Sequence, residues 1–461
     1  MNLHTGVLTN ANHVSIKDTN FNVNNTWSQP DHGSPEQARL FEHSASGALL
    51  NSNERFNPPR CAPGTRLAPI STVTNWIHGG GQTSSVMMLT GSVGSGKTAI
   101  AQTIAEKIKE EGLLLACHFF ARTSDHDHRN DGDRLAPNLV SQMMNTIPET
   151  RQYVELGIKQ NSMIFSQHPE GVFEDLFIRP LLLAVDPDFE KSQRFSLMKT
   201  IEKFLGLRGP SINVNLKRLV LIDALDECLG QDMQIHLLRM IAKAVPKLPV
   251  PIRFLIACRP ESHIRSIFNQ EFGHVPLDRL NLDDDRNATR KDLELYYKDR
   301  FAVIHREHPS IKRRQRYASW PTPAQVRILV ERSSTQFIFA DTVMNYISHP
   351  RSHPYKRLAV ILNVSGAYIP QPDKPYLPLD IIYAHMLLQI NDADIESVRR
   401  ILEVVYLSEL PEFLGSGVQP SPLFIEALFG LDDGDVPRLL DPLVSILVLP
   451  ELPTGRIDLG S

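Results

Sequence analysis

The stretch VMMLTGSVGSGKTAI, residues 86–100, decides the fold, because it joins an apolar strand, a glycine-rich loop and the start of a helix. Inside it, Gly91 to Thr98 fit GxxxxGK[ST], the pattern of a phosphate-binding P-loop. The glycines let successive backbone N–H groups point at phosphate oxygens, and the helix that begins near Lys97 adds the positive end of its dipole. We predict that Lys97 reaches the β- and γ-phosphates and that Thr98 binds Mg²⁺. The predicted nucleotide-binding residues are Gly91, Ser92, Val93, Gly94, Ser95, Gly96, Lys97, Thr98 and Ala99.

A second motif lies about 130 residues further along, where the apolar strand LVLI (219–222) delivers carboxylates at its end. Asp223, Asp226 and Glu227 repel one another unless a cation lies between them, so together with the P-loop they indicate a Walker B site. We predict that Asp223 binds Mg²⁺, in part through water. Glu227 and Asp226 are both candidates to activate the attacking water, with a slight preference for Glu227. The alternative is an acidic helix start that uses these carboxylates as caps.

A third strand, RFLIAC (253–258), ends in Arg259. An arginine at this edge of the sheet can sense or stabilise a γ-phosphate if its strand lies between the other two. Its alternative is a surface arginine that precedes a turn. Further strands are expected at 113–121 and 277–282, with helices between them, and this alternation favours an α/β fold with a doubly wound parallel sheet.

Length and composition limit the possible classes of protein. At 461 residues, with 42% hydrophobic and 22% charged residues, the chain is typical of a globular protein with roughly three domains. A net charge of -4 gives no global reason to expect nucleic acid as a partner. The N-terminus lacks the features of a signal peptide, and no apolar run approaches ~18 residues, so no membrane partner is expected. We therefore expect a cytoplasmic protein.

Several other features have ordinary explanations that we prefer. Residues 1–60 are rich in Asn and predict a flexible extension, in which 13–27 could form a short hairpin or an assembly motif. The cluster at 125–128 could hold a metal, but its spacing matches no ligand pattern. A basic cluster at 312–316 favours a solvated surface over nucleic-acid contact. Four isolated cysteines are expected to be reduced.

Beyond the sheet the chain predicts helices broken by prolines. They are expected at 322–333, 337–347, 358–362, 381–390, 401–407, 422–428 and 436–447. A β-prone piece follows, so the end of the chain reads as a small helical unit with a wing. None of these helices carries an obvious chemical motif on its face.

These motifs together resemble a NACHT domain of the signal-transducing NTPases with numerous domains (STAND). The resemblance rests on GSVGSGKT, on LVLIDALDEC with its small Ala224 and its DE pair, and on FLIACRPE. The segments CAPGTR, CHFFAR, RNDGDRLAPNLVSQM, FIFADTVMNYI, KPYLPLDIIYAHML and LLDPLVSILVLP resemble the fungal set of nephrocystin-like NACHT proteins. The resemblance extends over nearly everything from about residue 14 onward.

The resemblance implies four regions: an extension at 1–60, a P-loop NTPase core at 61–275, the end of the sheet and a helical domain at 276–375, and a winged-helix-like domain at 376–461. It also implies that the Arg259 strand lies between the P-loop and Walker B strands. In such proteins ADP holds a closed state, and exchange for ATP opens the chain for self-association. The family's usual repeat array and effector domain are absent from this sequence, as is a histidine that helps close the site, so we expect a truncated C-terminal domain.

The resulting expectation is a switch that binds ATP or ADP, with GTP or GDP as the alternative, together with Mg²⁺. It would hydrolyse the nucleotide slowly, oligomerise in response to it, and act on an unknown signalling partner in defence or incompatibility. Lys97, Glu227, Asp226 and Arg259 would carry the chemistry. Two alternatives are an interaction scaffold that holds nucleotide without turnover and a small-molecule kinase, which is the weakest because such enzymes are compact.

Overall fold

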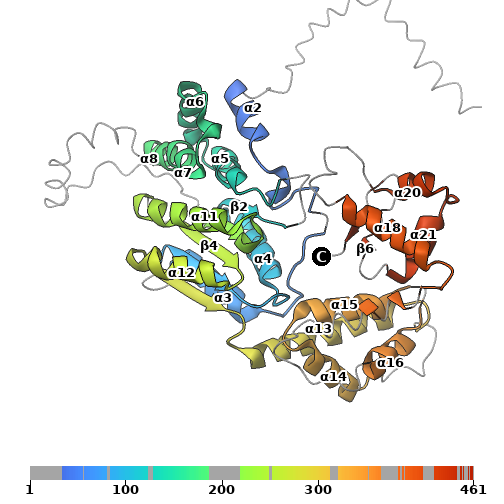
Figure 1. The fold of residues 1–461 in the computed structure, drawn as a ribbon. Helices are drawn as coiled ribbons and strands as arrows, with labels where there is room; N and C mark the ends of the chain where they lie inside the picture. The colour runs from blue at the N-terminus through green and yellow to red at the C-terminus, as the bar shows by residue number, and fades with distance from the viewer. Residues whose placement is uncertain are drawn as a thin grey trace, which may run out of the picture.

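A five-stranded parallel sheet forms the core of the α/β part of this computed structural model (Figure 1). The structure describes residues 34–55, 57–79, 84–122, 128–185, 219–248, 252–311, 320–350, 352–364, 383–384, 387–388, 390–408, 420–443, 447–448, 450, 455 and 457–459. The predicted hairpin at 13–27, the basic cluster, and all of the acidic and histidine cluster except His128 lie outside these ranges.

The strands follow one another in the order β2-β3-β4-β1-β5, and every pair is parallel. Their bounds are β1 Val86–Thr90, β2 Leu114–Phe119, β3 Leu219–Asp223, β4 Arg253–Cys258 and β5 Leu277–Asn281. All five predicted strands are therefore present. The strand that ends before Arg259, β4, lies between β3 and β1, which confirms the order that the family resemblance implied.

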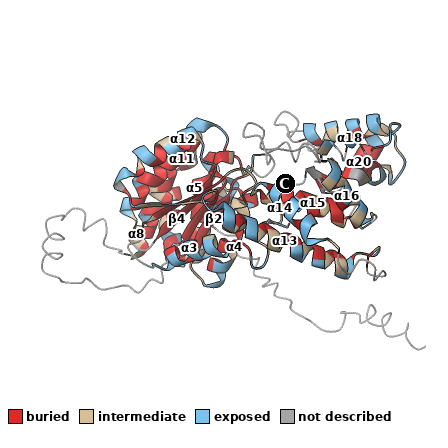
Figure 2. Cartoon of the chain, turned by 90° about the horizontal axis from the view of Figure 1, so that it is seen from below, coloured by how far each residue is buried: buried red, intermediate tan, exposed pale blue. Residues whose placement is uncertain are grey.

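Helices cover both faces of the sheet, as the continuous apolar strands predicted (Figure 2). One face packs against α3 (Leu67–His78) and α4 (Lys97–Glu110) through residues such as Ile77 and Ile104. The opposite face packs against α5 (Leu135–Thr146), α11 (Gln231–Ala244) and α12 (Ser262–Gln270). The doubly wound α/β fold is thus confirmed.

A smaller helical layer extends the core beyond α5. It consists of α6 (Arg151–Gln160), α7 (Pro169–Phe173) and α8 (Arg179–Val185), with a π-helical turn at Glu174–Ile178. The helix α2 (Pro35–Glu42) packs beside it: its side chain Leu40 is buried in the same core, and Gln37 donates to Glu155 Oε1 at 2.7 Å. The sequence reading did not predict α2, because Leu40 is its only buried side chain and leaves no periodic pattern.

A helical region follows the sheet. It contains α13 (Arg286–Glu307), α14 (Pro323–Ser333), α15 (Phe337–Ser348) and α16 (Pro354–Val364). Two of these helices begin at a side-chain cap: Asp285 caps α13, and Thr322 and Gln325 form a capping box at α14. The end of the chain forms α18 (Ile395–Leu407), α20 (Pro422–Phe429), α21 (Asp435–Leu440) and the antiparallel pair β6 (Leu447–Val448) and β7 (Asp458–Leu459). One hydrophobic core joins both groups. The exact domain bounds and the winged-helix assignment stay predictions.

Three of the four cysteines are buried, Cys117, Cys228 and Cys258, and all four are free thiols, as predicted. None of the helices that the structure describes has the length and apolar character needed to cross a bilayer.

Candidate functional site

The glycine-rich loop, residues 91–98, connects the end of β1 to the first turn of α4, as the motif predicted. Gly94 and Gly96 have φ values of 72° and 89°, a left-handed backbone that favours glycine. The loop closes over its own lysine: Lys97 Nζ donates to the carbonyls of Gly91 at 2.9 Å and Ser92 at 3.0 Å. Burial lowers the pKa of Lys97, and the nearby Asp226 and Asp223 oppose that shift.

Two residues that the sequence reading did not assign to the site hold this loop from outside. Asp283, just after β5, accepts from the Ser92 N–H at 2.7 Å and from the Ser92 hydroxyl at 3.0 Å. Arg66, just before α3, donates to the Ser95 carbonyl at 2.7 Å. For Asp283 a signal existed, since it begins an acidic run at the carboxyl end of a predicted strand; for Arg66 the only signal was its place in CAPGTR.

Asp223 ends β3 and is 1% exposed. Both of its carboxylate oxygens are buried without a hydrogen-bond partner among the described residues. Burial raises its pKa to about 7, against the opposing effects of the Thr98 hydroxyl, which lies nearby outside hydrogen-bond geometry, and of Arg55 and Lys97. A buried carboxylate beside a threonine hydroxyl fits a Mg²⁺ site, because Mg²⁺ prefers oxygen ligands.

The turn after β3 separates the two candidate bases. Ala224 has a left-handed backbone, with φ 55° and ψ 42°, and a short 3-10 turn (Leu225–Glu227) follows it. This turn buries Asp226, whose side chain is 2% exposed, and leaves that of Glu227 29% exposed. Burial raises the pKa of Glu227, partly offset by the Arg122 N–H, which donates to its Oε2 at 3.1 Å.

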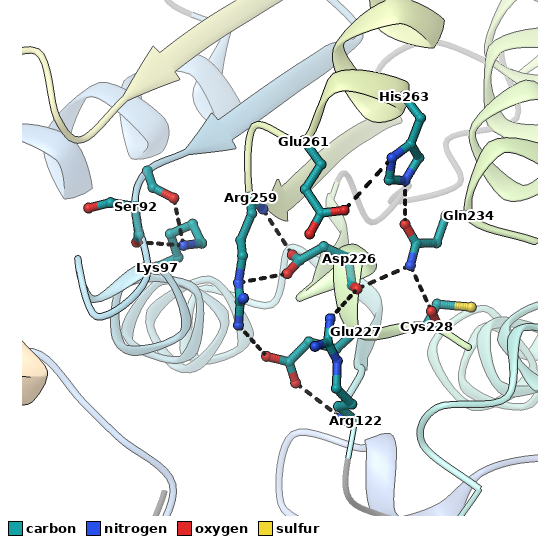
Figure 3. Close-up of polar contacts among 11 residues, drawn as sticks. Ser92, Lys97, Arg122, Asp226, Glu227, Cys228, Gln234, Arg259, Glu261 and His263 are labelled. Carbon is teal, nitrogen blue, oxygen red and sulfur yellow. Dashed lines mark hydrogen bonds and ion pairs between the residues drawn. The ribbon is translucent and has the colours of Figure 1, made fainter. Parts of the chain in front are cut away.

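Arg259, at the end of β4, links both carboxylates (Figure 3). Its backbone N–H donates to Asp226 Oδ1 at 2.9 Å, and its Nε lies 3.0 Å from Asp226 Oδ2. Its Nη2 lies 3.7 Å from Glu227 Oε1. The structure therefore brings Arg259 to the carboxylates. Lys97 lies close enough to Asp226 and Asp223 for their charges to act on its pKa.

A second layer of polar side chains holds the turn between β3 and α11. Gln234 on α11 donates from Nε2 to the carbonyls of Asp226 at 3.1 Å and Cys228 at 2.7 Å. His263 Nε2 lies 2.7 Å from Gln234 Oε1, and its Nδ1 lies 3.7 Å from Glu261 (Figure 3). Sequence reasoning missed this chain of contacts, because an isolated Gln and an isolated His carry no motif.

Arg55 brings one more buried cation to the same edge of the sheet. Its guanidinium lies 3.6 Å from the centre of the Phe119 ring and donates to Gln102 Oε1 at 2.9 Å. Burial lowers its pKa to about 10, and the charge of Asp223 is the largest effect that opposes this shift. Arg55 and Lys97 thus act electrostatically on Asp223, while Arg259 pairs with Asp226 and Glu227.

These elements define the class of the protein: an α/β chain with a P-loop-like fold, followed by a helical region. Its residues 67–190 match the model of a family described as Nephrocystin 3, N-terminal. The match includes the glycine-rich loop and β2, and it ends before the carboxylate turn and Arg259. No curated protein matches the chain. This likeness agrees with the nephrocystin-like resemblance of the sequence, while membership of the NACHT class stays a prediction.

Proposed function

We propose that the chain binds a purine nucleoside triphosphate, ATP or alternatively GTP, with Mg²⁺ at the glycine-rich loop. The observation that carries this proposal is the position of Asp223 beside Thr98 and Lys97: it is a buried carboxylate whose two oxygens have no hydrogen-bond partner in the described part of the chain. Burying an ionised carboxylate at this strand end costs free energy unless a cation compensates its charge. The loop before α4 supplies backbone N–H groups and a helix N-terminus for the phosphates.

The roles of the residues follow from their positions. Thr98 and Asp223 would hold Mg²⁺, which neutralises phosphate charge when bound. Lys97 would move from the carbonyls of Gly91 and Ser92 to phosphate oxygens, which are stronger acceptors. Arg259 would sense the γ-phosphate, and Glu227 would orient or deprotonate the attacking water, since Arg259 already engages Asp226 through a hydrogen bond to Oδ1 and an ion pair at Oδ2.

We further propose that hydrolysis is slow and that the nucleotide acts as a switch. Arg259 is bound to both candidate bases, so part of its interaction with them must be given up when it contacts a phosphate. A γ-phosphate can then shift the equilibrium between two conformations of the chain only by the difference between its affinities for them. By analogy with the NACHT resemblance, the ATP state would self-associate and engage a signalling partner in defence or incompatibility. We expect no nucleic-acid or membrane partner and a cytoplasmic location.

One observation favours a second candidate function, a scaffold that holds nucleotide without turnover. The ion pairs of Arg259 occupy the two carboxylates on which hydrolysis depends. If those pairs persist with nucleotide bound, neither carboxylate is free to act on a water molecule.

The first test is the nucleotide that the purified protein carries. We expect ADP or ATP in the denatured extract of the wild-type chain and none from Lys97→Ala. Lys109→Ala is the matched control, because it removes an exposed lysine from the last turn of the same helix. A wild-type chain that retains no nucleotide at micromolar concentration would refute both functions.

The second test separates the switch from the scaffold. Glu227→Gln should bind nucleotide as the wild type does but release phosphate about 10²-fold more slowly, the lower range for loss of a general base. An unchanged rate in Glu227→Gln assigns the base to Asp226 or elsewhere, and a wild-type chain without turnover favours the scaffold. Light scattering with ATP and with ADP tests the oligomer: one size with both nucleotides contradicts the switch.

A further inference from the structure

The segment Cys61–Arg66, CAPGTR, contacts both the glycine-rich loop and the helical region. At its start, the Cys61 N–H donates to Thr103 Oγ1 on α4 at 3.1 Å. In its middle, Gly64 has φ +80°, and a Cβ there would lie 3.0 Å from Leu295 on α13. The segment therefore lies against the helix that follows the loop and against the first helix beyond the sheet. Neither the motifs nor the proposed function accounts for these contacts.

Arg66 is the residue of this segment that reaches the loop itself. Its side chain is buried, with the residue 5% exposed. Nη2 donates to the Ser95 carbonyl at 2.7 Å, and Nη1 donates to Thr289 Oγ1 on α13 at 2.8 Å. The guanidinium also lies over the ring of Phe337, the first residue of α15, at 4.8 Å. One side chain thus contacts the glycine-rich loop and two helices of the helical region.

The same loop accepts hydrogen bonds directly from the first turn of α15. The N–H groups of Phe337 and Ile338 lie 2.8 Å and 3.4 Å from the Gly94 carbonyl. Just before this turn, Ser334 and Thr335 have φ values of 46° and 73°, which are unfavourable for non-glycine residues and most of all for a β-branched one. Strain of this kind persists where surrounding contacts impose it, and it is concentrated at functional segments.

The planarity of the peptide bond links these contacts to phosphate binding. The Ser95 carbonyl and the Gly96 N–H belong to one planar, trans peptide unit, so they point in opposite directions. By holding the carbonyl toward α13, Arg66 fixes the direction of the Gly96 N–H. That N–H is one of the donors that the loop would offer to a phosphate.

We propose that Arg66 is a positioning residue of the nucleotide site and that it couples the glycine-rich loop to α13 and α15. That the ligand is a nucleotide rests on the proposed function, whereas the contacts between the loop and the helices do not depend on it. Arg66 orients the Gly96 N–H for phosphate, and any rearrangement of the loop changes the support of the first turn of α15. Nucleotide binding is thereby reported to the helical region.

The first experiment needs no nucleotide. Hydrogen exchange is compared in Arg66→Ala, in the wild type and in Arg60→Ala, a control that removes an arginine of the preceding segment, paired with Glu106 at the surface. We expect about tenfold faster exchange at residues 337–341 in Arg66→Ala, the usual effect of losing a hydrogen bond to a charged group, with unchanged exchange in β1 and β4. Exchange equal to that of Arg60→Ala overturns the coupling.

A second variant keeps the proposal testable if Arg66→Ala does not fold. Thr289→Val removes one hydrogen-bond partner of Arg66 at nearly constant volume, in a residue that is 1% exposed. It should accelerate exchange at residues 337–341 about threefold while the strands stay protected. Acceleration throughout the sheet in this variant would make the role purely structural and overturn the proposal.

The nucleotide arm uses a fluorescent ADP analogue. We expect Arg66→Ala to bind it at least about tenfold more weakly than Arg60→Ala, and Arg66→Lys to recover part of the affinity because it retains one charged donor. In the wild type the analogue should also slow exchange at residues 337–341, an effect lost in Arg66→Ala. Equal affinity in Arg66→Ala and Arg60→Ala overturns the positioning role. A wild-type chain that binds no analogue refutes the proposed function instead, and the exchange comparison still decides the coupling.

Discussion

Replacing Gly94 by alanine should separate α15 from the glycine-rich loop, and the structure allows the cost to be worked out. The added Cβ would lie 2.3 Å from Ile338 Cγ2 and 3.2 Å from Ile338 Cβ. The second distance matters most, because that atom is the branch point of the side chain and rotation about χ1 leaves it in place. The first turn of α15 must therefore move. Its two N–H groups then weaken their hydrogen bonds to the Gly94 carbonyl.

Two effects add in Gly94→Ala. The φ of +72° costs a non-glycine residue about 1–2 kcal/mol. Overpacking against Ile338 costs roughly another 1–3 kcal/mol. We therefore expect the free energy of unfolding to fall by about 2–5 kcal/mol.

Gly96→Ala is the matched control for this prediction. Its φ of +89° carries the same backbone cost, but no heavy atom of the described residues lies within 4 Å of the position of its Cβ, apart from its chain neighbours. In urea unfolding followed by circular dichroism, without nucleotide, the free energy of unfolding of Gly96→Ala should therefore be about 1–3 kcal/mol higher than that of Gly94→Ala. In Gly94→Ala/Ile338→Ala the part of the steric cost that comes from Cγ2 should disappear as a favourable coupling energy, while the part from the Cβ atom, which alanine retains, should remain. Equal stabilities of the two glycine variants, or no coupling with Ile338→Ala, would refute the reasoning.

Three further predictions concern the charged groups. Arg259→Ala removes the ion pair of the buried Asp226 and leaves it the hydrogen bond from the backbone of residue 259. The free energy of unfolding in urea should fall by about 3 kcal/mol, the low end for a broken buried pair, because the Arg259 side chain is 31% exposed. Arg259→Ala/Asp226→Asn should recover most of this loss. The pKa of Asp223 is about 7 in the folded chain and about 3.8 in the unfolded chain. In Mg²⁺-free buffer the stability that its protonated form contributes should therefore be lost as pH rises from about 4 through 7. The urea midpoint of Asp223→Asn should depend less on pH than that of the wild type, and parallel curves would contradict this. Asp283→Ala frees the Ser92 N–H and should speed hydrogen exchange in residues 91–96 by about tenfold without changing β1; no change there would mean that this contact does not hold the loop.

The elements with a strong local pattern were predictable. Each apolar strand, the helix after the loop and most later helices appear within a few residues of their predicted bounds, because burial on both faces or on one stripe leaves a periodic trace. The helix α2 left no such trace. It is held by single contacts, such as Leu40 in the core and the bond from Gln37 to Glu155, and a single contact has no period.

The site was predictable only in its motif residues. Lys97 begins the helix after the loop, and the other four, Asp223, Asp226, Glu227 and Arg259, lie at or just after the ends of β3 and β4, which are neighbours in the sheet. The anchors of the loop were not predictable, since Asp283 contacts a residue 191 positions away and no local pattern encodes that distance. The difference between the two candidate bases depends on the left-handed backbone at one alanine after β3, which a sequence of ordinary residues does not indicate.

The glycine pattern that suggested a phosphate site has a second physical cause here. Gly96 needs only its left-handed backbone, since no residue with a described position crowds the place of its Cβ. Gly94 needs both its backbone and its missing side chain, because Ile338 of α15 fills the space where a Cβ would lie. A glycine at position 94 therefore serves the contact with the helical region as well as the turn of the loop. Since the α15 N–H groups and Arg66 hold adjacent carbonyls of that loop, its shape and the docking of the helical region are set by the same few atoms.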